Sequence, residues 1–147
     1  MKTAENEERE AVGMLAGELV CFVHVEGLFQ VYGSPALYDG GDGCVKFDPV
    51  IMDLIRIEFG TDATFAIVAH ELGHRLQDMH GEKFTQEGAD FVAGCALARS
   101  GRPVTPFLDF LKKYDAGPPS FDARAAATLA GAEYCAHNMR AINWIGP

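Results

Sequence analysis

Residues 61–80 read TDATFAIVAHELGHRLQDMH, and this stretch predicts the helix around which the rest of the fold is built. Thr61 or Asp62 can cap its N-terminus, and Gly81 supplies the left-handed residue that ends it. Apolar residues recur along the stretch at the 3.6-residue helical period, so one face is expected to turn toward the core. The residues of that face are Phe65, Ala69, Leu72, Leu76 and Met79.

The other side of the same helix carries two histidines, His70 and His74, one helical turn apart. Imidazoles at this spacing can occupy two corners of a zinc tetrahedron, and Glu71 between them can act as the base toward a water molecule on the metal. This is the HExxH arrangement, here HELGH. The competing interpretation is an amphipathic helix whose His and Glu side chains are merely solvated, and the motif alone does not decide between the two.

A catalytic zinc site needs a third protein ligand and an open position for water. His80 completes the spacing of HExxHxxGxxH, but Gln77 stands where that motif needs a glycine to turn the chain sharply. If the helix continues to its end, His80 lies roughly 280° around the axis from the first histidine and points away. Better candidates are Glu87 and Asp90, which share a face of the next predicted helix where a metal site lacks a ligand; the alternative is that they are acids that only favour a helix N-terminus. Gly94 on that face is expected to let this helix approach the histidine helix closely.

The remaining pattern is mostly helical. Apolar spacing and glycine or proline breaks predict helices at residues 5 to about 25, 49–59, 85–100, 105–114 and 120 to about 141. Only the segment after the first of these is β-like, with strands expected at Phe29–Tyr32 and Cys44–Phe47 around a glycine-rich turn. The predicted fold class is therefore α+β, mostly helical, with a small antiparallel sheet. The length of 147 residues suits one domain, residues 1–147.

Composition limits the classes of function. Twelve Lys and Arg against 21 Asp and Glu give a net charge of −9, which argues against nucleic acid because a phosphate backbone needs a basic face. No apolar run approaches the length of a membrane span, and the acidic start of the chain is unlike a signal peptide. The four cysteines, Cys21, Cys44, Cys95 and Cys135, form no CxxC pair, so free thiols in a reducing compartment are expected. We therefore predict a cytoplasmic protein that binds neither nucleic acid nor membrane.

Two stretches extend the pattern beyond the motif. They are DGCVKFDPVIMDLIRIEFGTDATFAIVAHELGHRLQ, residues 42–77, and EGADFVAGCALARSG, residues 87–101. Together they resemble a family of bacterial neutral zinc metallopeptidases, relatives of the gluzincin peptidases, over residues 28–101. The matching features, in collinear order, are KFDP, the FG before the motif helix, AIVAHELGHRLQ and ADFVAG. The resemblance implies a zincin-like fold, a zinc cofactor and the hydrolysis of peptide bonds.

The resemblance also implies roles for individual residues. The HELGH histidines would be zinc ligands, Glu71 the catalytic base, and a glutamate of the second helix the third ligand. In the family that glutamate stands four residues before the aspartate that matches Asp90, but this chain has Gln86 there and its glutamate one residue later, at Glu87. A neutral amide is a poor zinc ligand. Glu87 is therefore predicted as the third ligand, with Asp90 as the hydrogen-bonding partner of a histidine or as a substitute ligand.

Two functions follow from the residues and the resemblance. The first is a zinc metallopeptidase acting on peptides or proteins, in which Glu71 takes a proton from water and gives it to the leaving amine. In that function the strand Cys44–Phe47 is expected to pair with extended substrate. Tyr134 and His137 are candidates for stabilising the oxyanion, with ordinary helix side chains as the alternative. The second function is a weakly active or inactive zincin-like domain that binds metal and serves as an interaction module, its activity lost with the displaced glutamate.

Overall fold

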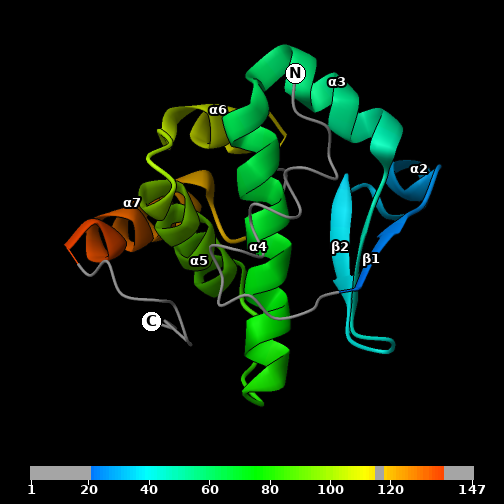
Figure 1. Cartoon of the computed structure of the whole chain (residues 1–147), viewed down its shortest axis with the longest axis horizontal. Helices are drawn as coiled ribbons and strands as arrows, with labels where there is room; N and C mark the ends of the chain where they lie inside the picture. The colour runs from blue at the N-terminus through cyan, green and yellow to red at the C-terminus, as the bar shows by residue number, and fades with distance from the viewer. Residues whose placement is uncertain (1–20, 115–117, 138–147) are drawn as a thin grey trace.

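Helix α4 runs through the middle of the molecule, with the strands on one side and α5, α6 and α7 on the other (Figure 1). The structure is a computed structural model, and it describes residues 21–114 and 118–137. The fold is α+β and mostly helical, as predicted. The elements in chain order are β1 (Cys21–His24), α2 (Leu28–Tyr32), β2 (Ala36–Asp39), β3 (Cys44–Phe47), α3 (Pro49–Phe59), α4 (Thr61–Met79), α5 (Gln86–Arg99), α6 (Thr105–Tyr114) and α7 (Phe121–His137).

The strands form one mixed sheet in the order β1-β3-β2. Strand β2 is antiparallel to β3, whereas β1 is parallel to β3, so the expectation of a purely antiparallel sheet was wrong. Strand β1 comes from residues that were expected to end a helix; the rest of that expected helix, residues 5–20, lies outside the described residues. Cys21 and Cys44 face each other in the β1–β3 register and form a disulfide. Pairing with a strand 23 residues away is a tertiary effect that a local helical pattern does not reveal.

The segment Phe29–Tyr32 was predicted as a strand and belongs instead to a short helix, α2 (Leu28–Tyr32). Glycines with left-handed backbone bound it on both sides, Gly27 at φ 81° and Gly33 at φ 70°. The buried side chain of Leu28 anchors the helix to the core, and the carboxylate of Asp48 accepts a hydrogen bond from the backbone N–H of Phe29. Its aromatic and β-branched residues favoured a strand, but the two flanking glycines and this anchoring favour one and a half turns of helix.

The longer helices begin and end close to the predicted residues. Asp48 accepts hydrogen bonds from the first N–H groups of α3, and Thr85 caps α5 in the same way through Gly88. Four of the five residues predicted on the core face of α4 are buried, while Met79, its last residue, is 47% exposed. Among the helices of the described residues, none is both long and apolar enough to cross a membrane.

Helices α5 and α7 pack backbone against backbone. A Cβ on Gly94 would lie 1.9 Å from the carbonyl oxygen of Thr128, and one on Gly131 would lie 2.0 Å from that of Phe91. Gly94 was expected to serve the contact with the histidine helix, and this was wrong because it faces α7. The glycine that brings α4 and α5 together is Gly73, inside the HELGH motif, where a Cβ would lie 2.9 Å from a backbone atom of α5.

Two disulfides link these elements. Cys95 of α5 is bonded to Cys135 of α7, and both side chains are fully buried; Cys21 is bonded to Cys44 across the sheet. The prediction of free thiols was therefore wrong. Sequence spacing could not reveal the pairs, since the two members of each lie 23 and 40 residues apart and meet only in the folded chain.

Candidate metal centre

The HELGH segment lies in the middle of α4, where the helix is buried on nearly all sides. His70 is 6% exposed and Glu71 is 7% exposed. The imidazole of His74 stands perpendicular to that of His70, with ring centroids 4.8 Å apart. Nε2 of His70 lies 3.7 Å from a carboxylate oxygen of Glu71. The two histidines and the glutamate therefore converge as the motif predicts.

His70 is held by a buried carboxylate from the next helix. Its Nδ1 donates to Oδ1 of Asp90 over 2.8 Å, and Asp90 has no exposed surface. This confirms the prediction of Asp90 as a histidine partner. Arg124 of α7 binds both oxygens of the same carboxylate, through Nε at 2.7 Å and Nη2 at 2.9 Å. In the neutral form of the ring, the lone pair of His70 therefore lies on Nε2, which faces the side of Glu71.

The charges of this cluster shift the pKa of its members. Burial acts to raise the pKa of Asp90, but the charges and hydrogen bonds of His70 and Arg124 outweigh it, and the pKa lies below its usual value. Burial likewise acts to lower the pKa of His70, and the Asp90 carboxylate reverses the sign, so that this pKa is raised. The Asp90 carboxylate thus bridges His70 and Arg124 and joins α4, α5 and α7.

His74 is oriented by an amide instead. Its Nδ1 donates to Oε1 of Gln77 over 2.9 Å, and the Gln77 side chain is only 2% exposed. The amide nitrogen of Gln77 donates to the carbonyl and the hydroxyl of Thr85, both at 3.2 Å, which fixes which way the amide faces. Burial, and then the neighbouring charge of His70, lowers the pKa of His74 to about 4. The ring is neutral at neutral pH, with its lone pair on Nε2.

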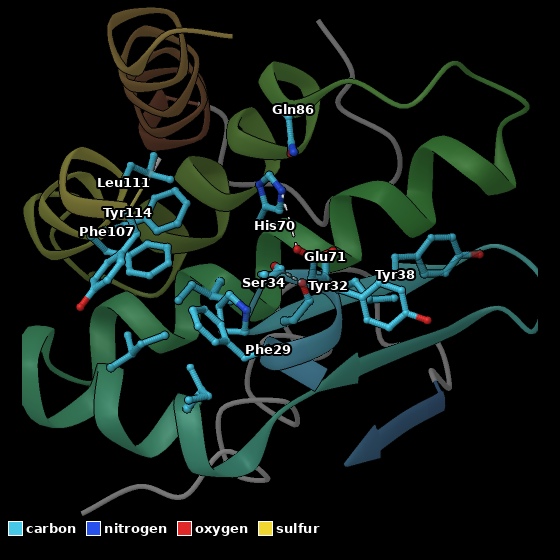
Figure 2. A pocket seen from close by; sticks show the side chains of 18 of the residues that line it. Phe29, Tyr32, Ser34, Tyr38, His70, Glu71, Gln86, Phe107, Leu111 and Tyr114 are labelled. Atoms are coloured by element: carbon cyan, nitrogen blue, oxygen red, sulfur yellow. Dashed lines mark hydrogen bonds and ion pairs between the residues drawn. The ribbon is translucent and has the colours of Figure 1, made fainter. Parts of the chain in front are cut away.

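Gln86, the first residue of α5, lies over this lone pair. Its Oε1 is 3.2 Å from Nε2 of His74, and Figure 2 shows its side chain pointing toward His70 as well. Since Nδ1 of His74 carries the proton, Nε2 and Oε1 are both acceptors, and two facing lone pairs repel each other. A cation bound by both atoms, or a rotation of the amide, removes the repulsion. The donor set thus fits a metal ion, with an amide oxygen where a carboxylate would bind more tightly.

Glu87, the predicted third ligand, lies elsewhere. It is exposed in the first turn of α5 and does not line the cavity that contains the histidines. One residue is about 100° of helix rotation, so Gln86 and Asp90 share the face turned to α4, while Glu87 faces away. In the described part of the chain, no three His, Cys, Asp or Glu side chains gather as a metal-binding group. Of the predicted ligands, the structure brings together His70 and His74.

The other candidates lie outside the site. His80 follows the last residue of α4, and its Nδ1 donates to the carbonyl of Leu76 over 2.9 Å. Neither Tyr134 nor His137 lines the cavity, and the ring of Tyr134 packs against Phe91 with centroids 5.8 Å apart. The alternatives that the sequence left open for the metal and the oxyanion therefore find no support in the geometry.

Glu71 is suited to take up and release a proton near neutral pH. Burial raises its pKa to about 7, against the charge of His70 and a hydrogen bond from the backbone N–H of Tyr38, which both lower it. Tyr38 belongs to β2, so the carboxylate lies between the motif helix and this strand. A general base works best when its pKa lies near the working pH.

The strand with a free edge beside the motif is β2, and not β3, which was expected to pair with substrate. β3 is paired on both sides, with β1 and β2, so it has no edge for substrate, and that prediction was wrong. Within the described sheet β2 is the edge strand nearest the motif, and its residues line a cavity of about 750 Å³ together with His70, Glu71 and His74 (Figure 2). An extended peptide can be paired only by a strand with a free edge.

Sequence reasoning missed three of the residues that hold the centre. Arg124 sits in a helix of alanines 34 residues after Asp90, and nothing in its spacing signals the contact. Gln77 was noticed only as the residue that replaces a glycine. Gln86 was noticed only as the residue that replaces a glutamate.

Comparisons of the chain with protein-family models, with curated proteins and with solved structures found no match.

Proposed function

We propose that the chain is a zinc-dependent metallopeptidase that hydrolyses peptide bonds. One observation carries the proposal: each motif histidine has its Nδ1 hydrogen-bonded to a fixed acceptor, so that in the neutral rings both Nε2 atoms present a lone pair beside Glu71 and Gln86. A helix with merely solvated histidines has no reason to bury Asp90 and Gln77 as their partners.

Three side chains would hold the ion, His70 and His74 through Nε2 and Gln86 through Oε1. Zinc, when bound, acidifies a water molecule to a pKa of about 7 and polarises the carbonyl of the substrate. Glu71 accepts the proton of the attacking water and then donates it to the leaving amine, so that it ends the cycle ionised as it began. Asp90 and Arg124 keep the His70 ring from rotating while the proton moves.

The substrate is proposed to lie along β2. The outer edge of β2 offers backbone N–H and C=O groups to an extended peptide, and the N–H of Tyr38 already reaches the catalytic carboxylate. A peptide paired there has its backbone next to Glu71. This supports a peptide or protein substrate over a compact small molecule.

Gln86 favours a second candidate function, a zincin-like domain that binds metal weakly and acts as an interaction module. An amide carries no charge, so the ion would be held by neutral ligands alone. The site would then bind the ion more weakly than a site with a glutamate at this position, and would lose it more readily on dilution. The same histidine geometry serves both candidates. They differ only in whether peptide bonds are cleaved.

The location is also a proposal. Disulfides persist in oxidising compartments and are rare in the reducing cytoplasm. The pairs Cys21–Cys44 and Cys95–Cys135 therefore favour an oxidising compartment over the cytoplasmic location expected from the sequence.

Zinc content and peptidase activity, measured on the same preparations, test the proposal. We expect about one zinc per wild-type chain after reconstitution, its loss in His74→Ala, and its retention in Glu87→Ala. Glu71→Gln should keep zinc and lose turnover of a peptide library. Zinc bound without any turnover, in wild type as in Glu71→Gln, would favour the interaction module. An absence of zinc binding in wild type would reject both candidates.

A further inference from the structure

The cavity that contains the motif continues away from the histidines into an apolar end. Two helices form this end, and each contributes residues at the spacing i, i+3, i+4, so that one face of each helix meets the other across the cavity (Figure 2). From α3 these residues are Ile51, Leu54 and Ile55, and from α6 they are Phe107, Phe110 and Leu111. Aromatic and aliphatic walls beside a few polar groups are typical of binding pockets.

The apolar end of the cavity also carries little net charge. Glu58 lies one turn beyond Ile55 and lines the same cavity, but its carboxylate is paired with Lys113 and accepts a hydrogen bond from the hydroxyl of Tyr114 over 3.1 Å. That pairing lowers the pKa of Glu58 and offsets its charge, so the pocket offers little to a basic side chain. Leu54 keeps 56% of its surface exposed and Tyr114 keeps 48%, which leaves apolar area to be covered by a ligand.

The ligand that the apolar end would bind can be inferred from its position in the same cavity as Glu71. The apolar end and Glu71 line one cavity, and β2 runs along its wall from Ala36 to Tyr38. Side chains of an extended peptide point alternately to the two sides of its backbone, so a peptide paired with β2 turns one side chain into the cavity. We propose that the apolar end is a specificity subsite for one large apolar side chain, aromatic or branched aliphatic, next to the bond to be cleaved. The subsite deepens the proposed peptidase function and rests on it.

Helix α3 offers a matched pair of variants. Leu54 lines the cavity, whereas Ile57, three residues later and 76% exposed, does not. Leu54→Glu places a charge in the subsite, and Ile57→Glu places the same charge on the same helix outside it. Both residues are largely in water already, so neither substitution buries a charge in the core.

Binding is measured in full-length Glu71→Gln, which cannot complete hydrolysis, by fluorescence anisotropy with labelled, end-blocked octapeptides. The two peptides differ only in one central residue, Phe or Ser. We expect the Phe peptide to bind more tightly by about tenfold or more, since burying such a side chain favours binding strongly. Adding Leu54→Glu should remove most of this difference, while adding Ile57→Glu should retain it.

Equal affinities for the two peptides, or equal losses in both variants, would overturn the subsite. Cleavage of a peptide library by the wild-type protein is measured in parallel and tests the proposed function separately. Discrimination between Phe and Ser without cleavage means that the subsite stands and the peptidase function fails. Cleavage with no preference for apolar residues at any position near the bond means that the peptidase function stands and the subsite fails.

Discussion

In the proposed zinc site, the residue that should govern the affinity for the ion is the one at position 86. Oε1 of Gln86 already lies 3.2 Å from Nε2 of His74, so Gln86→Glu puts a charged oxygen at the same place. We expect zinc affinity to rise by more than about tenfold, because substitutions even outside the ligand shell change it by that much. Competition with a fluorescent zinc chelator measures the change, and peptidase activity should rise with it.

The control for this variant is Glu87→Gln. Its side chain is exposed and turned away from the cavity, so we expect unchanged zinc affinity. The opposite result, a loss of zinc in Glu87→Gln and no gain in Gln86→Glu, would mean that Glu87 is the third ligand, as the sequence predicts.

The stability of the metal-free protein should depend on pH through Glu71. Burial raises the pKa of Glu71 from 4.5 to about 7, so folding favours its protonated form. The stabilisation is present in full below pH 4.5, the pKa of the group in the unfolded chain, and is lost as pH rises through about 7. In the metal-free protein we expect this group to remove about 3 kcal/mol of the free energy of unfolding across that window.

Urea denaturation of metal-free wild type and Glu71→Gln at pH 5, 6, 7 and 8 measures this contribution. Glutamine is neutral throughout, so the variant should lose less stability than wild type as pH rises. Asp90 has the opposite sign, since its lowered pKa adds stability above its unfolded value, but that contribution is present in both proteins and cancels in the comparison. Parallel curves for the two proteins would contradict the raised pKa.

The sequence could predict those parts of the site that lie within one helix. His70, Glu71 and His74 converge because helical periodicity alone sets their spacing. Asp90 could be predicted as a partner from the next helix. Gln86, by contrast, required knowing which face of α5 meets α4, a choice that depends on packing at Gly73 and not on local pattern.

At the scale of elements, the chain was predictable where short-range signals agree. Helices α3 to α5 end at or just before a glycine, and the bounds of α3 to α6 match the expected ones within a residue or two. Of the short elements before α3, the strand β3 was predicted with its observed bounds, whereas α2 was expected as a strand and β1 as the end of a helix. Both are decided by contacts across the fold, namely the anchoring of Leu28 and the pairing of β1 with β3.

The helix pair α5–α7 gives a prediction at this scale. In Gly131→Ala the added Cβ would meet the carbonyl of Phe91 at 2.0 Å, so the helices must move apart. We expect a loss of about 1–3 kcal/mol in the free energy of unfolding, the usual cost of overpacking. Because Arg124 lies on the same helix, the shift should also loosen its hold on Asp90 and weaken zinc binding.

Chemical denaturation and zinc competition of Gly131→Ala are compared with Gly40→Ala. A Cβ on Gly40 meets its nearest neighbour at 3.8 Å, an ordinary contact, so that variant should keep both properties. If Gly131→Ala keeps wild-type stability and zinc affinity, close packing of the two helices is not what positions the Arg124–Asp90 pair.

At the scale of the whole molecule, the disulfides and the site depend on the same contacts. Cys95–Cys135 joins α5 to α7, the two helices that carry Asp90 and Arg124. Cys21–Cys44 joins β1 to the central strand and so supports the sheet whose edge, β2, lines the cavity. Oxidation of the chain and integrity of the candidate site should therefore be coupled.

The last prediction tests this coupling. Replacing both members of the helix disulfide, Cys95→Ala with Cys135→Ala, should lower the free energy of unfolding by about 4 kcal/mol, since the bond closes a loop of 40 residues. Urea denaturation without reductant measures the loss, and zinc affinity should fall with it because Arg124 loses its support. As a control for the compartment, wild type is alkylated in denaturant without reductant, after production in an oxidising or in a reducing compartment. If the cysteines are alkylated in protein from both sources, and both preparations are equally stable, the disulfides are contradicted. The cytoplasmic location expected from the sequence would then be favoured again.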